Sequence, residues 1–421
     1  MSVSYCSIDC QKCDWNQHKL ECKLSKNIKK LLESKVDIDS LLLMIRTFNN
    51  LKSAPKNCSY SEDNFLHHKC GLIHCESLIN YPRDLLYSEQ LMIDFISETF
   101  LKSKEDVKKI YLSFENNSFG ILDELLGCIG SGVFPAGAML NHSCVPNCVL
   151  RYNFFENVPV LEIVALTSIE MGTELCHSYI DCCLSRKERI QKLCESYHFI
   201  CKCPRCSDTF TERVPAQVTT LADPFQVKLC IENFIKEGKK EKATMFDTDE
   251  RENHKKEVND VSSSSLVEVD KLTRQIRVTP DIYQSVLNKS SYLCLQYEHS
   301  QEDPIETVQY LEEAVGILHQ VCGPYHIELY KARGLLLSAY LLNGDYKKSC
   351  VECMHLVNFL TVVYVNIPNH PLLGLQLYTL ADLMSYEQHP QAIEAYRWAY
   401  CILKITSSPN SEMISKLKLF I

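Results

Sequence analysis

The sequence predicts an α+β fold that is followed, toward the C-terminus, by an all-α array of helical hairpins. Apolar residues recur at helical spacing from Ile28 to Phe48 and again from Leu85 to Phe100. Two runs rich in β-branched and aromatic residues, at 149–154 and 160–166, flank a short turn and predict a β-hairpin. Helical spacing returns over residues 281–421. These patterns indicate a small β-rich core between two helical regions.

Composition limits the classes of function. A chain of 421 residues is long enough for several domains with sizeable cores. Its formal net charge of −9 argues against direct nucleic-acid binding as the main activity. The sequence has no apolar run of about 18 residues that could cross a membrane, and its first residues lack the order of a signal peptide. We therefore expect a protein of the nucleus and cytoplasm without membrane insertion.

The 23 cysteines lie mostly at or before Cys206, often at short spacings. In a reducing compartment such clusters indicate zinc ligands rather than disulfides. The later cysteines, for example Cys294 and Cys350, lie in helical patterns and are expected in the core. The cysteine pattern thus predicts zinc sites in the first half of the chain.

Residues 1–22 carry a first candidate zinc site. The spacing is Cys6-x3-Cys10-x7-His18-x3-Cys22, with Cys13 as a spare thiol. Thiolate and imidazole are the usual zinc ligands. Because His18 and Cys22 are four residues apart, a helix would present both on one face.

Residues 23–115 are predicted to be helical, with Asp37 or Asp39 as the cap of a helix that begins near residue 38. A further group of potential metal ligands meets no recognised spacing and is interpreted as ordinary residues of this helical region: His67, His68, Cys70, His74 and Cys75.

Residues 116–182 contain the hairpin and a polar, turn-rich knot, Gly137–Cys148. Asn141 and His142 supply amide and imidazole groups there, and Pro146-Asn147 favours a turn. Residues 171–175 predict a turn that enters another strand.

A second candidate zinc site lies in residues 183–207. A helix with basic residues leads to Cys201-x-Cys203-x2-Cys206, a spacing short enough to wrap one ion. The fourth thiolate would come from the knot, from Cys144 or Cys148. A site closed by four thiolates is structural, because no position remains for water.

The last two regions differ in character. Residues 208–280 include a mixed-charge stretch that is interpreted as a connecting linker. In residues 281–421, apolar pairs followed by Gly/Pro/Asn-containing turns repeat at roughly 42–44 residues, which favours stacked hairpins of tetratricopeptide type.

Three stretches together resemble the SET domain of protein-lysine methyltransferases: the knot N-H-S-C-x-P-N at 141–147, the segment Glu174–Asp181, and the cysteine tail Cys201–Cys206. Residues 1–22 resemble the second half of a MYND zinc finger. With the helical array, their order resembles the SMYD (SET and MYND) family over nearly the whole chain. The resemblance implies these regions: partial MYND finger 1–22, helical SET insert 23–115, SET core 116–182, post-SET zinc region 183–207, linker 208–280 and helical repeat domain 281–421.

The family resemblance implies an S-adenosylmethionine-dependent protein-lysine N-methyltransferase that acts on histone tails or other proteins. Tyr179 matches the catalytic tyrosine, and Cys144 is favoured over Cys148 as the cysteine of N-H-S-C. The substrate channel is matched by Phe119, Tyr179 and Tyr197, the cofactor contacts by Asn117, Asn141, His142, Tyr179 and Phe199, and the zinc ligands by Cys144, Cys201, Cys203 and Cys206, with Cys6, Cys10, His18 and Cys22 in the partial finger.

The sequence also departs from the family pattern. The family begins with a glycine-rich G-x-G loop and two further finger ligand pairs, which have no counterpart here. Gly130-Ser131-Gly132 matches the G-x-G pattern, but it lies directly before the knot rather than at the start of the chain. We therefore expect weak cofactor binding by the chain as written, and either an incomplete finger or four ligands regrouped around one zinc.

The alternative function is a weak or inactive scaffold that binds peptides through the finger remnant and the array. A zinc hydrolase is disfavoured, because no open three-ligand site is apparent.

Overall fold

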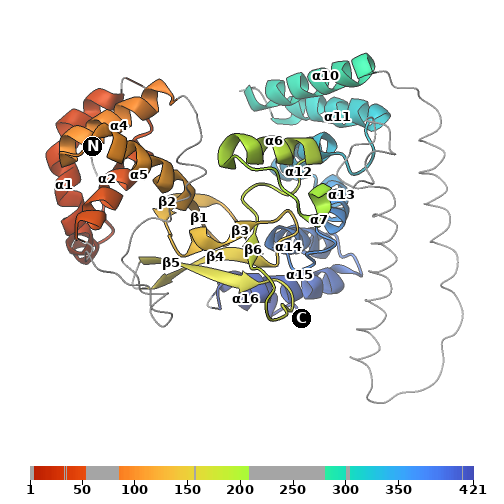
Figure 1. The fold of residues 1–421 in the computed structure, drawn as a ribbon. Coiled ribbons are helices and arrows are strands. Elements are labelled where there is room, and N and C mark those ends of the chain that lie inside the picture. The colour runs from red at the N-terminus through yellow and green to blue at the C-terminus, as the bar shows by residue number, and fades with distance from the viewer. Residues whose placement is uncertain are drawn as a thin grey trace, which may run out of the picture. The chain divides into compact units, whose positions relative to one another are not determined.

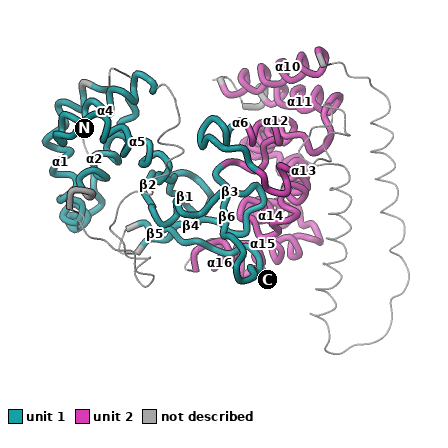
Figure 2. Tube along the Cα trace, viewed as in Figure 1, with its two compact units in different colours: residues 1–179, 191–201 teal, residues 180–190, 202–421 magenta. Residues whose placement is uncertain are grey.

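The structure is a computed structural model that describes residues 4–32, 34, 36–53, 85–155, 158–207, 280–299, 304–409 and 411–421. It divides into two compact units, residues 1–179 with 191–201 and residues 180–190 with 202–421 (Figure 2). The cluster His67–Cys75 and residues 208–279 of the predicted linker lie outside the described residues. None of the helices in the described part of the chain has the length and apolar character that a membrane span needs.

In the residues that the structure describes, the first unit begins with helices α1 (Ile8–Leu32), α2 (Ile38–Ser53), α4 (Tyr87–Phe100) and α5 (Lys104–Asn117) (Figure 1). Their apolar faces form one core around Ile28, Ile45 and Ile96, as the helical spacing predicted. Asp37, one of the two predicted caps, accepts from the Asp39 N–H at 3.1 Å at the start of α2. Val133 of the strand region packs against the same core, so the helices support the sheet elements.

Three short strand pairs follow in the first unit. β1 (Ser118–Leu122) pairs antiparallel with β2 (Cys128–Val133), and β4 (Cys148–Phe155) pairs antiparallel with β5 (Val158–Ala165). The second pair is the predicted hairpin, with Cys148 opposite Ala165. The strand predicted after residue 175 is only two residues long, β6 (Cys176–His177), and pairs in parallel with β3 (Asn141–His142) in the knot.

The second unit contains the predicted array, in which successive helices pack on one another. The array runs through α10 (Pro280–His299), α11 (Pro304–Val321), α12 (Ile327–Leu342), α13 (Tyr346–Val363), α14 (Pro371–Tyr386), α15 (Ala392–Thr406) and α16 (Glu412–Leu417). The repeated turns have a structural counterpart, since His326 and His370 cap α12 and α14 in the same way. The expected α+β fold with a helical C-terminal region is thus confirmed for the described residues.

The segment after the SET-like strands belongs to the second unit. Residues 180–190 and 202–207, with the short helix α7 (Pro204–Ser207), cluster with the C-terminal helices. The Sγ of Cys183 lies 3.5 Å from the hydroxyl of Tyr364 in α13–α14. Helix α6 (Arg186–Tyr197) contributes residues to both units.

Candidate functional site

The side chain of Asn147 joins the knot to the segment before β6 through two hydrogen bonds. The amide of Asn147 accepts from the N–H of Cys176 at 2.8 Å and donates to the carbonyl of Glu174 at 2.8 Å. The backbone N–H of Ser143 donates to the carbonyl of His177 at 3.0 Å, which extends the β3–β6 pairing. These bonds join two stretches about 30 residues apart and fix the position of Tyr179, which directly follows.

Tyr179 is held at its backbone and at its hydroxyl. Its N–H donates to Nδ1 of His142 at 3.0 Å, and its hydroxyl donates to the carbonyl of Leu140 at 2.6 Å. Because Nδ1 of His142 accepts, the proton of the neutral imidazole lies on Nε2, which is 3.2 Å from Sγ of Cys144. His142 therefore links the backbone of Tyr179 to the predicted zinc ligand Cys144.

Aromatic rings surround Tyr179. Its ring centroid lies 4.8 Å from Tyr197, 4.9 Å from His177 and 6.4 Å from Phe199. Phe119 contacts His177 at 6.1 Å, so the three predicted channel residues belong to one ring cluster. Such a cluster offers apolar walls for an alkyl chain and quadrupolar faces for a cation.

The predicted cofactor residues differ in their surroundings. Asn141 is exposed and donates to Glu174 Oε1 at 2.6 Å, and the ring of His142 lies 6.0 Å from that of Phe199. Asn117, in contrast, is fully buried at the end of α5, where its amide donates to the carbonyl of Ser113 at 2.7 Å. A cofactor contact stays a prediction for Asn117, as it does for Asn141, His142 and Phe199, of which His142 and Phe199 are ring neighbours.

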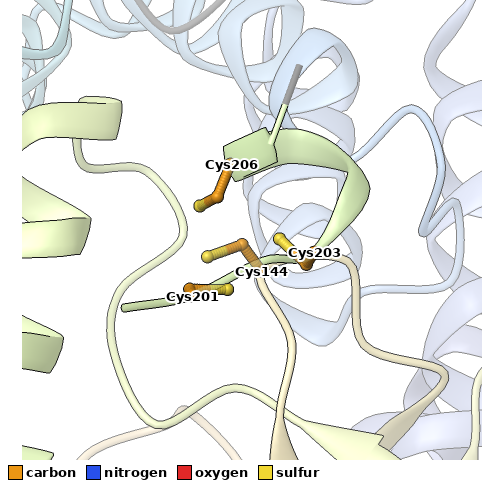
Figure 3. A group of neighbouring side chains, drawn as sticks. All are labelled: Cys144, Cys201, Cys203 and Cys206. Carbon is orange, nitrogen blue, oxygen red and sulfur yellow. The ribbon is translucent and has the colours of Figure 1, made fainter. Parts of the chain in front are cut away.

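The four predicted post-SET ligands come together. The sulfur atoms of Cys144, Cys201, Cys203 and Cys206 all lie within 4.8 Å of one another and point toward a common centre (Figure 3). A tetrahedral zinc with Zn–S bonds of about 2.3 Å needs sulfur atoms about 3.8 Å apart, so the donor set fits that ion. Cys148, the competing ligand, is buried elsewhere, and burial raises the pKa of its thiol.

Cations also surround this cysteine group. Arg189 is almost fully buried, and its Nη2 lies 3.8 Å from Sγ of Cys206, while Nε of Arg186 donates to the Cys206 carbonyl at 2.7 Å. Four thiolates around Zn²⁺ carry a net charge of −2, so neighbouring guanidinium groups suit a loaded site.

The N-terminal candidates are arranged differently. Cys6 and Cys10 lie at the start of α1 with their sulfur atoms 3.2 Å apart, whereas Nδ1 of His18 faces the carboxylate of Glu21 at 3.3 Å. In the part of the chain that the structure describes, no group of three or more metal-ligating side chains includes Cys6, Cys10, His18 or Cys22. The structure thus does not regroup these four around one ion, and their role as finger ligands stays a prediction.

Two residues of the site had no signal in the sequence. His177 lies between two channel aromatics, and Arg189 lies against a zinc ligand, yet neither belongs to a recognised spacing. The only hint was the position of His177 two residues before Tyr179, which on a strand places both side chains on one face.

Comparisons with known proteins agree with this geometry. Residues 5–180 match the family model of the SET domain. The chain is 30% identical over 222 residues to N-lysine methyltransferase SMYD2-A of Xenopus laevis, covering 52% of this chain and 50% of that protein. It is 29% identical over 222 residues to human N-lysine methyltransferase SMYD2, covering 52% and 49% of the two chains. The chain spans about half the length of the curated relatives it matches. The chain thus carries a SET domain over residues 5–180 and is similar, over about half of its length, to N-lysine methyltransferases of the SMYD2 type.

Proposed function

We propose that this chain transfers a methyl group from S-adenosylmethionine to the side-chain amine of lysine in protein substrates. The observation that carries the proposal is Tyr179, fixed at both ends within a cluster of aromatic rings. Histone tails and other lysine-bearing proteins are the proposed substrates, so the nucleus and cytoplasm are the expected places of action.

Methyl transfer to an amine needs little general acid–base catalysis from the protein. When bound, S-adenosylmethionine supplies an electrophilic methyl group on a positively charged sulfur. The exposed amide of Asn141, the imidazole of His142 and the ring of Phe199 would hold that cofactor.

The channel residues prepare the attacking amine. Walls formed by Phe119, Tyr179 and Tyr197 would shield the lysine side chain from water, and such desolvation would lower the pKa of the lysine so that its amine is neutral. The hydroxyl of Tyr179 donates its proton to the Leu140 carbonyl, so toward the incoming amine its oxygen would act as a hydrogen-bond acceptor. Holding the amine in line for attack supplies much of the rate enhancement.

The cysteine group supports the same residues. A zinc ion bound by Cys144, Cys201, Cys203 and Cys206 would fix the tail next to His142, because Cys144 is also the neighbour of that imidazole. The ion would be structural, since four thiolates leave no open coordination position.

The proposal is tested by two measurements on the full chain. Calorimetric titration with S-adenosylmethionine tests binding, and transfer of a tritiated methyl group to histones and a lysine peptide library tests catalysis. Tyr179→Phe serves as the control that keeps the ring and removes the hydroxyl. Cofactor binding with transfer that depends on Tyr179 is the expected result. Binding without any transfer would favour a non-catalytic, peptide-binding scaffold, and the absence of both would overturn the proposal.

A further inference from the structure

His177 carries a buried nitrogen whose partner is not supplied by the fold. The residue is 6% exposed and is the last residue of β6. Its Nδ1 lies 3.1 Å from the carbonyl oxygen of Ser178, which can only accept, so Nδ1 carries the proton and donates. In the neutral ring Nε2 is then an acceptor. Within the described residues, Nε2 is buried and has no hydrogen-bond partner.

The surroundings of this nitrogen are the predicted substrate channel. The imidazole contacts the rings of Phe119 at 6.1 Å and Tyr179 at 4.9 Å. Nε2 is one of the two ring atoms farthest from the backbone, in an imidazole whose ring neighbours are these two aromatics. Buried polar atoms are nearly always satisfied, and exceptions mark places where a ligand or water completes the set.

The imidazole is also in the right charge state to receive a donor. Burial lowers the pKa of His177 to about 4, so the ring is neutral at physiological pH. A neutral acceptor attracts the N–H groups of an amine or ammonium, whereas a protonated ring would repel them. Of these two ring neighbours, Phe119 carries no lone pair and Tyr179 carries its hydroxyl.

We propose that His177 contacts the substrate directly, with Nε2 accepting a hydrogen bond from the amine of the target lysine. The proposal rests on the proposed function, and it adds a residue to the channel. Tyr179 and His177 would then hold two different N–H groups of one amine, since their rings are neighbours.

A consequence follows for the degree of methylation. Each transferred methyl group replaces an N–H, and a buried acceptor that loses its donor is costly. His177 therefore favours an amine that still carries N–H groups and disfavours repeated methylation. We expect the chain to stop at a low degree of methylation, and expect removal of the Nε2 acceptor to relax that limit.

The first test does not depend on catalysis. The full chain with ¹⁵N-labelled histidine is titrated with n-butylamine, an analogue of the lysine side chain, and the imidazole nitrogens are followed by NMR. The His177 signals are assigned by their loss in His177→Gln. A saturable shift of Nε2 of His177, with no change at the exposed His389, is the expected result. An unchanged Nε2 signal at saturating amine would overturn the proposal.

The second test follows the products. Mass spectrometry measures the ratio of dimethylated to monomethylated lysine that the parent, His177→Leu and His177→Gln produce on the same peptides. We expect the ratio to rise about tenfold in the leucine variant and to stay near the parent value in the glutamine variant, which keeps an acceptor. An unchanged ratio in an active His177→Leu chain contradicts the proposal. If the parent transfers no methyl group, the proposed function fails, and the amine titration still decides the role of His177.

Discussion

The C-terminal array should lose stability in mild acid because of His370. Nδ1 of this residue accepts from the N–H of Leu372 at 3.3 Å, and its ring stacks on Tyr364 at 3.7 Å with an angle of 5° between the planes. The capping bond requires the neutral imidazole, since a protonated Nδ1 cannot accept. Desolvation lowers the pKa of His370 to about 3 in the folded chain, against a model-compound value of 6.5.

These two pKa values determine the sign and the size of the change in folding free energy as the pH falls. As pH falls below 6.5, the unfolded chain takes up the proton first, so folding becomes less favourable until the folded-state pKa is passed. From pH 7.5 to pH 5.0 the expected loss from His370 is about 2 kcal/mol, at about 1.4 kcal/mol per pH unit below 6.5. The value at pH 5.0 depends little on the folded-state pKa, because His370 in the folded chain is still almost wholly neutral there.

The assay isolates the array through its tryptophan. The chain has two tryptophans, and in a Trp15→Phe background the fluorescence of Trp398 in α15 reports urea unfolding of this unit. His370→Asn keeps a capping acceptor without titrating in this range, so it should lose about 2 kcal/mol less on acidification than the parent. His389→Asn is the matched control, because that exposed histidine also accepts a backbone N–H, from Gln391. Equal losses in the His370 variant and the parent would refute the reasoning.

Three further outcomes can be checked. Tyr179→Phe should lower kcat by about 10²-fold with little change in cofactor affinity, and unchanged turnover would remove the tyrosine from the reaction. Cys203→Ser should release about one zinc per chain in metal analysis, whereas Cys148→Ser should keep the parental content. Arg46→Met should destabilise the first unit by about 2 kcal/mol, since it leaves a buried carboxylate in α1 without its cation, whereas Lys12→Met, which breaks an exposed pair, should cost under about 0.5 kcal/mol; a urea titration that follows Trp15 of α1 in a Trp398→Phe background measures both.

Local signals in the sequence predicted the elements of the fold well. The β4–β5 hairpin was predicted because its alternation and its turn lie within about 20 residues. The pairing of β3 with β6 was not, because a strand of two residues has no period to detect. Its stability comes from the side chain of Asn147, which reaches a segment that only the folded chain brings near.

In the candidate site, too, local spacing predicted some residues and only the folded chain revealed others. The short spacing of Cys201, Cys203 and Cys206 predicted that these three cysteines share one ion. The fold brings the sulfur of Cys144, which lies far earlier in the chain, next to them. The spacing in α1 is ambiguous, because residues four apart fit both a helix face and a metal site, and the helix begins as early as Ile8. Burial of Arg189 escaped prediction because a basic residue in an amphipathic helix usually faces water, whereas the folded chain gives this guanidinium the carbonyl of Leu184 and the sulfur of Cys206 as partners.

Two contacts lead from the cysteine group to Tyr179, and they predict what metal removal does. His142 has one nitrogen against the sulfur of Cys144 and the other against the N–H of Tyr179. Chelation of zinc would release the Cys144 side chain from the position that the ion imposes, and the imidazole would then lose the neighbour that fixes its orientation.

We therefore expect the Tyr179 amide to exchange its hydrogen faster after chelation, by about tenfold if the bond to His142 is worth about 1.4 kcal/mol. The amide of Leu166, which donates to the Asn147 carbonyl at 2.8 Å, is the internal control, because that bond does not involve His142. Equal acceleration at both amides would indicate general loosening of the unit. An unchanged Tyr179 amide in the zinc-free chain would show that the tyrosine is positioned by the knot alone.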